Sequence, residues 1–323
     1  MITVNSHSDY AIQAYRERLL RNRDALKEDY LPQLKKGGVN LEVIQVACDF
    51  FTFQGLDLND PRHVLASIDS ILMSIQDNPE DFLLITRNSH IDELESSDKI
   101  GFLVSIEGAA SIDERFSLLR TYFRLGLRSM ALTHNPRNIF AEGCVENRTT
   151  GLSRVGKNLV DEINRLSLLL DLSHVNERCF FEALDIYQKP PIVSHSNARA
   201  VHDHFRNLTD EQIKAVAQKN GVIGLNFMSL FTHKDIKQAS VEHIIDHLDH
   251  MVSIAGIDHV GFGPDFTDYF PPPDNQVYVK GSENITEFST LRNALSNRGY
   301  GAQDIDKIMG KNFVRVFGEV LEP

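Results

Sequence analysis

The sequence has little of three features that would assign it to a particular class of protein. Its three cysteines (Cys48, Cys144 and Cys179) are widely spaced and form no Cys-x-x-Cys pair, which disfavours a disulfide scaffold and fits a reducing, cytoplasmic location. No cluster of basic residues interrupts a net charge of −12, so a nucleic-acid partner is not expected. No apolar run approaches the ~18–20 residues that cross a bilayer, and the first ten residues lack the pattern of a signal peptide. We therefore expect no membrane partner.

Short apolar runs recur along the 323 residues, of which 42% are hydrophobic. Each run is nearly continuous rather than alternating, which is typical of parallel strands that are buried on both faces. The predicted strands are residues 2–6, 41–47, 101–106, 129–133, 168–173, 191–194, 221–226 and 259–263.

Longer amphipathic segments separate these runs and predict helices at 9–26, 60–76, 150–166, 208–221 and 240–256. Asp60 is a predicted N-cap with Pro61 in the first helical position. Thr209 and Gln212 have the spacing of a capping box, and Gly221 is a predicted stop signal.

Alternation of strand and helix repeated eight times predicts a (β/α)8 barrel that forms a single domain over residues 1–323. A doubly wound open sheet is the competing fold, but the Gly-x-Gly-x-x-Gly that would follow its first strand is absent. The Pro-rich segment 266–284 is predicted to be a long loop after the last strand.

Polar or ionisable residues follow seven of the eight runs. They are His7 and Asp9, Glu107, His134, His174, His195, Asn226 and Asp265. Because the carboxyl ends of barrel strands meet on one face, where catalysis takes place, we expect these side chains to converge.

The residue types in this group are those that bind zinc or a similar metal. His7 and Asp9 are two positions apart, so they can point to the same side of a strand. Glu107 would be costly to bury without a cation nearby, and no lysine is available at any strand end to bridge two metals. Asp171 precedes His174 by three residues and is either a support for the ligands or a structural residue. Taken alone, Arg206 reads as a surface arginine before a helix.

Several segments resemble the membrane (renal) dipeptidases, a family of binuclear zinc peptidases in the amidohydrolase superfamily. The similar segments, in the family's order, are NSHSD (5–9), IEGA (106–109), LTHN (132–135), LLLDLSH (168–174), SHSNARAV (194–201) and VGFGPDF (260–266). The resemblance extends from residue 3 to about residue 318.

The resemblance implies a metal centre with two zinc ions. His7 and Asp9 would bind one ion, His174 and His195 the other, and Glu107 would bridge them together with a water or hydroxide. The implied reaction is hydrolysis of the peptide bond of a dipeptide, and the C-terminal residue of the substrate could be a D-amino acid.

The resemblance also implies roles for three further residues and a homodimeric assembly. His134 would contact the scissile carbonyl, Arg206 the substrate carboxylate and Asp265 the catalytic water. Asn5-Ser6 replaces the family's Asp-Gly, and Met228 stands where many members have a tyrosine, which affects the expected substrate preference rather than the metal ligands.

Two other functions remain open from the sequence. A mononuclear amidohydrolase, of the lactam hydrolase or deaminase type, would need one metal and no bridging carboxylate. A catalytically idle relative would keep the barrel without the chemistry, although every ligand position is filled in this chain.

Overall fold

The strands form one parallel sheet that curves into a nearly closed barrel. The computed structural model describes residues 1–49, 52–53, 56–146, 150–267 and 278–322. The barrel strands follow in the order β1 (Val4–Ser8), β2 (Leu41–Cys48), β6 (Ile100–Glu107), β7 (Leu127–Ala131), β8 (Leu169–Asp171), β9 (Ile192–Val193), β10 (Val222–Leu225) and β11 (Val260–Phe262). Each lies within or overlaps a predicted run, so the predicted (β/α)8 fold is confirmed.

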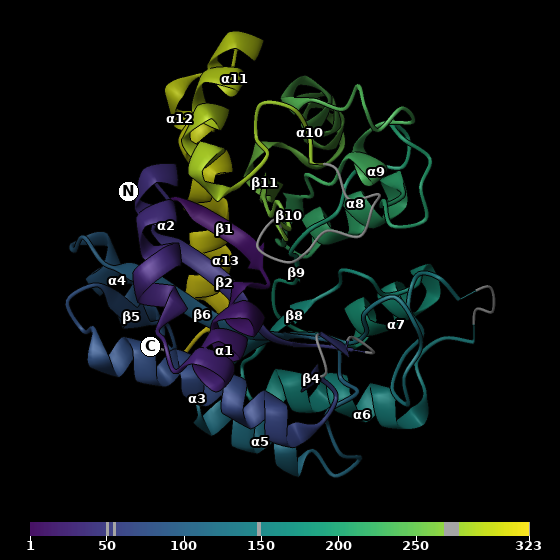
Figure 1. The fold of residues 1–323 in the computed structure, drawn as a ribbon. Coiled ribbons are helices and arrows are strands. Elements are labelled where there is room, and N and C mark those ends of the chain that lie inside the picture. Colours follow the sequence, from purple (N-terminus) through teal and green to yellow (C-terminus); the bar gives the residue numbers. More distant parts are fainter. Residues whose placement is uncertain (50–51, 54–55, 147–149, 268–277, 323) are drawn as a thin grey trace.

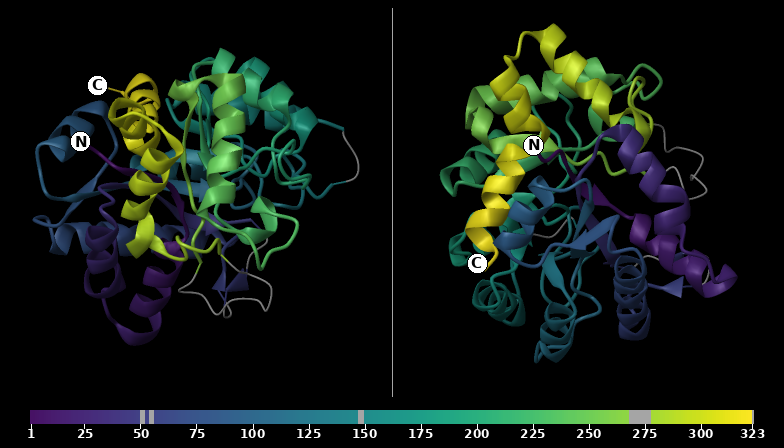
Figure 2. Two further views of the ribbon diagram at one scale, coloured as in Figure 1. Left: turned by 90° about the horizontal axis from the view of Figure 1, so that it is seen from above. Right: turned by 90° about the vertical axis from the view of Figure 1, so that its left-hand side faces the viewer.

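Helices surround the strands on the outside of the barrel (Figures 1 and 2). The α-helices are α1 (Tyr10–Arg21), α2 (Leu31–Gly37), α3 (Pro61–Asp77), α4 (Asn88–Glu95), α5 (Ser117–Arg124), α6 (Arg154–Arg165), α7 (Glu177–Ile186), α8 (Asp210–Gln218), α9 (Ser229–Thr232), α10 (Val241–Ala255), α11 (Leu291–Arg298), α12 (Ala302–Asp306) and α13 (Asn312–Val320). Shorter helical turns are η1 (Leu26–Tyr30), η2 (Ile257–His259), η3 (Ile285–Thr290) and η4 (Lys307–Lys311). The minor strands are β3 (Thr52–Phe53), β4 (Leu56–Asp57) and β5 (Phe82–Leu84), of which β5 pairs with the start of β6.

Local signals in the sequence set several helix ends. The Asp60 side chain accepts from the backbone N–H of Arg62 at the start of α3, and Thr209 forms a full capping box with Gln212 at the start of α8. The predicted stop at Gly221 is wrong by one residue, because Asn220 adopts the left-handed conformation (φ 58°) after α8. Asparagine tolerates this conformation better than most residues.

Two clusters of buried side chains stabilise the barrel, one at the amino-terminal ends of the strands and one between the strands and the surrounding helices. Side chains from the first residues of the strands, such as Val4, Leu41 and Val222, form one buried cluster with Phe313 and Phe317 of α13. Helix α13 therefore covers the amino-terminal end of the barrel. A larger cluster fills the space between the strands and the surrounding helices, and this arrangement leaves the carboxyl ends of the strands for the site.

No backbone pairing joins β1 to β11 within the described residues, and a serine side chain lies at this seam. The hydroxyl oxygen of Ser6 is 2.6 Å from the carbonyl oxygen of Ser194 and 2.9 Å from that of Phe262. Gly224 and Gly263 line the same region, where a Cβ would lie 2.2 Å and 1.9 Å from the Ser194 carbonyl oxygen. The first and last strands are thus held together by close packing with β9.

The predicted Pro-rich loop 266–284 is described only in part, since residues 268–277 lie outside the described residues. Within its described end, Tyr278 forms an isolated bridge with Met228, and Lys280 forms one with Ser240. A single domain over 1–323 stays a prediction. No helix in the described ranges is long and apolar enough to cross a bilayer.

Candidate metal centre

Irregular pairing at the carboxyl ends of β1 and β2 shapes the start of the site. The register between these strands shifts between Asn5 and Ser8, and the register of β2 with β6 shifts between Gln45 and Cys48. Such bulges occur at barrel rims, where they re-aim side chains. The Asn5 side chain accepts from the His7 backbone N–H, which fixes the irregular turn that carries His7.

Three imidazoles from the carboxyl ends of different strands converge on one carboxylate oxygen. The Glu107 Oε1 atom lies 2.8 Å from His174 Nε2 and 3.4 Å from His195 Nε2. The same oxygen is 3.7 Å from His7 Nε2. All of these residues are almost fully buried, so the carboxylate lies between imidazoles and not in water.

Of four overlapping groups of potential ligands in the described residues, two together contain all five predicted metal ligands, and these two meet at Glu107. One group is Glu107, His174 and His195, and the other is His7, Asp9 and Asp265. His7 Nε2 lies 3.6 Å from an Asp265 oxygen and 3.9 Å from an Asp9 oxygen. The structure therefore brings together all five predicted metal ligands and Asp265.

The hydrogen bond at Nδ1 of His174 directs the lone pair of its Nε2 atom into the cluster. Its Nδ1 atom lies 2.9 Å from the side-chain oxygen of Asn135, an acceptor, so the proton belongs on Nδ1. The lone pair of Nε2 then points at Glu107 and at His195 Nε2, which is 2.8 Å away. Lone pairs and a carboxylate repel one another at such distances unless a cation lies near them. The Arg206 guanidinium, 3.0 Å from His174 Nε2, is one such cation, and a bound metal ion would be another.

Two further ligand atoms lack any hydrogen-bond partner within the described part of the chain. They are the buried Nε2 of His7 and Oδ1 of Asp9. Buried polar atoms are rarely left without a partner. Nitrogen and carboxylate donors of this kind suit zinc, so the residues present fit a metal centre.

Burial perturbs every titratable group in the cluster. It lowers the pKa of His7 to about 3 and lowers the pKa of His174 and His195 well below the ordinary value. Burial, with the neighbouring Glu107 charge, raises the pKa of Asp265 to about 8. The histidines are thus neutral at neutral pH, as metal ligands must be.

The backbone is strained at two positions of the site. His174 (φ 64°) and Asp265 (φ 61°) both adopt the left-handed conformation, which is uncommon for residues other than glycine. Strained residues cluster at functional sites because surrounding contacts must hold them in place.

The three remaining predicted residues lie around the ligand cluster. The His134 ring packs on the His174 ring at 4.4 Å between centroids. Arg206 is buried, with Nη2 3.0 Å from His174 Nε2 and 3.3 Å from the His195 carbonyl oxygen. It is therefore not the surface arginine that the sequence alone suggested. Arg206 also lines a cavity of about 190 Å³ that extends from His174 between the loops after β8 and β9.

Several further residues support the cluster, and of these only Asn226 was expected from the sequence to converge on it. Asn135 orients His174, and the Asn226 side-chain amide donates to Asp265 at 2.9 Å. Gln45 Nε2 lies 3.3 Å from His7 Nδ1. His247 is fully buried, and its Nδ1 accepts from the Ala198 backbone N–H in the loop after β9. Asn135 was within the LTHN segment, but nothing in the sequence pointed to Gln45 or His247.

Comparison with known proteins identifies the family. The model of the family described as membrane dipeptidase, peptidase family M19, matches residues 1–322. The chain belongs to this family. Among its relatives, the dipeptidase tcpJ of Claviceps purpurea is 33% identical over 271 residues, which cover 83% of this chain and 60% of that protein. An uncharacterized dipeptidase of Schizosaccharomyces pombe is 34% identical over 68% of this chain and 53% of its own. This M19 family chain thus spans little more than half the length of these curated relatives.

Solved structures resemble this M19 chain over nearly all of its length. The metallopeptidase described as dipeptidase AC is 25% identical, with a TM-score of 0.88, and covers 100% of this chain and 99% of its own. A Rhodobacter sphaeroides metallopeptidase, bound to a phosphinate mimic of the dipeptide L-Ala-D-Ala, has a TM-score of 0.87 at 24% identity and covers 99% of each chain. The barrel fold is therefore shared throughout.

Proposed function

We propose that this chain is a zinc-dependent dipeptidase with two metal ions. The observation that supports the proposal most directly is the position of Glu107 Oε1, within 3.7 Å of the Nε2 atoms of His7, His174 and His195. A carboxylate that touches ligands of both groups is suited to bridge two ions. His7 and Asp9 would hold one ion, and His174 and His195 would hold the other.

The side chains around the proposed ions divide the reaction between them. When bound, two zinc ions would lower the pKa of a water toward ~7 and act as Lewis acids on the peptide carbonyl. Asp265, oriented by Asn226, takes a proton from the attacking water and delivers it to the leaving amine. His134 contacts the carbonyl oxygen and stabilises the charge that develops on it.

Arg206 accounts for the proposed preference for dipeptides. Its guanidinium is buried beside His174, and its Nε has no hydrogen-bond partner among the described residues. A guanidinium in this position pairs with the substrate's free carboxylate through two hydrogen bonds. Because the carboxylate is then fixed close to the metal groups, only one residue fits beyond the scissile bond.

The alternatives are less well supported by the same geometry. A mononuclear amidohydrolase would use only one ligand group, whereas the ligand atoms of each of the two groups are close enough together to hold an ion. A catalytically idle relative would not need the neutral, buried histidines or the strained backbone at His174 and Asp265. A cytoplasmic location and a homodimer remain predictions, the first from the three free cysteines and the second from the family resemblance alone.

The test is a panel of dipeptides with L and D C-terminal residues, incubated with metal-free protein to which Zn²⁺ is added stepwise. We expect hydrolysis to rise to a plateau at two equivalents per chain. A plateau at one equivalent would favour the mononuclear alternative. Two bound zinc ions without hydrolysis of any dipeptide would contradict the proposed substrate. Glu107→Gln should lose metal and activity together, and a variant that keeps both ions would refute the bridging role.

A further inference from the structure

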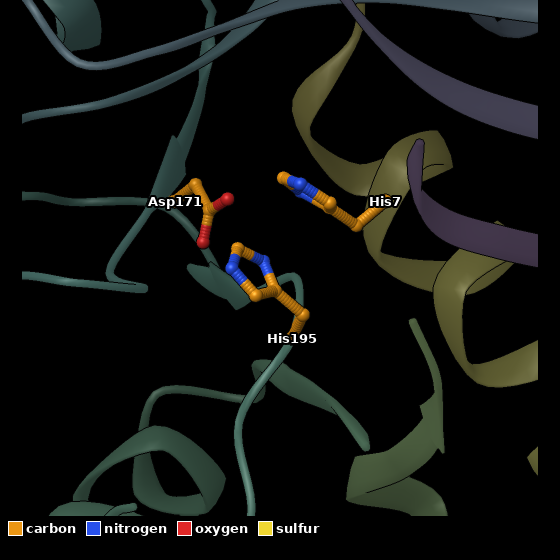
Figure 3. A group of neighbouring side chains, drawn as sticks. All are labelled: His7, Asp171 and His195. Atoms are coloured by element: carbon orange, nitrogen blue, oxygen red, sulfur yellow. The ribbon is translucent and has the colours of Figure 1, made fainter. Parts of the chain in front are cut away.

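One hydroxyl group lies beneath both ligand groups of the metal centre. The Ser194 Oγ atom is 2.8 Å from His195 Nδ1 and 3.4 Å from His7 Nδ1, and it forms a short hydrogen bond to the Asp171 carboxylate. Figure 3 shows that the side chains of His7, Asp171 and His195 point toward one another from β1, β8 and the end of β9. His7 and His195 belong to different ligand groups.

The direction of each hydrogen bond follows from the Asp171 carboxylate, which can only accept. Its Oδ1 accepts from the backbone N–H groups of Ser173 and Ser194, at 3.0 and 2.9 Å. Its Oδ2 therefore receives the Ser194 hydroxyl proton. The Ser194 hydroxyl oxygen has one further neighbour, the Ser173 hydroxyl at 3.2 Å.

With its proton given to Asp171, the Ser194 oxygen can only accept from the imidazoles. An accepting oxygen at Nδ1 places the ring proton on Nδ1 and leaves the Nε2 lone pair toward the metal groups. The same carboxylate thus acts through one hydroxyl on His195 and on His7. At His7 the side-chain nitrogen of Gln45 also lies 3.3 Å from Nδ1, so a ring proton there requires this amide to present its oxygen instead, an atom that otherwise has no partner among the described residues. All three residues and the hydroxyl are almost fully buried, so water does not compete for these bonds.

We infer that Asp171 and Ser194 form one positioning unit that fixes a ligand of each metal group. The inference rests on the metal centre of the proposed function but not on its substrate. Outer partners of ligating histidines set the orientation and basicity of the ring, and their loss lowers metal affinity by ~10–100-fold. Because both ligand groups share this unit, a single substitution in it should lower the affinity for both metal ions.

The decisive variant is Ser194→Ala, with zinc affinities measured by titration against a competing chelator. We expect both affinities to fall by ~10–100-fold, with the larger loss in the His195 group because its contact is shorter. The matched control is Ser129→Ala, in which an equally buried serine on β7 loses a hydroxyl that has no hydrogen-bond partner in the described ranges. This control should bind both ions as the unsubstituted chain does.

A second measurement detects the tautomers directly, independently of metal and activity. Spectra of metal-free protein labelled with ¹⁵N-histidine should show His7 and His195 protonated on Nδ1. Asp171→Asn keeps the side-chain shape but leaves one oxygen for three donors, so it should shift both rings toward mixed tautomers. This variant also serves if Ser194→Ala does not fold.

Unchanged affinities in Ser194→Ala, or loss at one metal alone, would overturn the shared unit. Protonation of His7 and His195 on Nε2 in the unsubstituted chain would overturn it as well. Two bound zinc ions without dipeptide hydrolysis would refute the proposed substrate and leave the positioning unit intact. If the chain bound no zinc, both the proposed function and the positioning unit would be refuted.

Discussion

The fully buried Glu42 should make the stability of this protein fall as the pH rises through neutrality. Glu42 lies on the outer side of β2, where its carboxyl accepts a short hydrogen bond from the Tyr30 hydroxyl. Tyr30 is in turn 3.0 Å from the Ser8 hydroxyl and stacks on Tyr10. Burial raises the pKa of Glu42 from the ordinary 4.5 to about 7, although the hydrogen bonds oppose this change.

The sign and size of the effect follow from that difference. Below the unfolded pKa, both states carry the proton and Glu42 has no pH-dependent effect. Between 4.5 and about 7 only the unfolded state ionises, so folding is progressively disfavoured, and above about 7 the loss is constant. A difference of this size corresponds to about 3 kcal/mol, of which about 2–3 kcal/mol should develop between about pH 5 and about pH 8.5.

The assay compares Glu42→Gln with the unsubstituted chain by denaturant unfolding of metal-free protein at these two pH values. The variant cannot ionise, so it should gain about 2–3 kcal/mol relative to the unsubstituted chain at the higher pH. The constant cost of burying an amide cancels in this comparison. The control is Glu162→Gln. Hydrogen bonds from Arg165 and Arg120 hold the pKa of Glu162 at about 2, so its effect should not change in this range. Equal effects of Glu42→Gln at both pH values would refute the reasoning.

Three further predictions concern the site and its packing. Arg206→Met should raise KM for dipeptides by ~10–100-fold, which corresponds to the loss of a charge-assisted hydrogen bond. The turnover of dipeptide amides should stay unchanged, because these substrates lack the carboxylate. A loss in kcat alone would contradict the proposed role of Arg206. Asp265→Asn should retain zinc but lower kcat by ~10²–10⁴-fold, and normal turnover would exclude Asp265 from proton transfer. Gly263→Ala should destabilise the protein by about 1–3 kcal/mol, because the new Cβ would lie 1.9 Å from the Ser194 carbonyl oxygen. Thermal unfolding checks this against Gly301→Ala, where nothing lies within 4 Å.

The amino-acid sequence by itself determined the strands, the barrel and the set of residues at the carboxyl ends of its strands. Parallel strands covered on both faces must be apolar along their length, so their ends are marked by the first polar residue. His174 and His195 stand at such ends, and the barrel geometry then implies that they meet. The capping box at Thr209 was likewise readable, because its hydrogen bonds join residues three positions apart.

Only the tertiary structure decided how those side chains are held. Ser194 and His7 are 187 residues apart, and their contact depends on the strand bulge at His7 and on the close packing at the barrel seam. The buried positions of Arg206 and His247 depend on neighbours from other loops, so a helical or loop pattern could not reveal them. Local patterns encode which residue follows a strand, whereas the proton on each imidazole is set by a partner that the folded chain brings from far along the sequence.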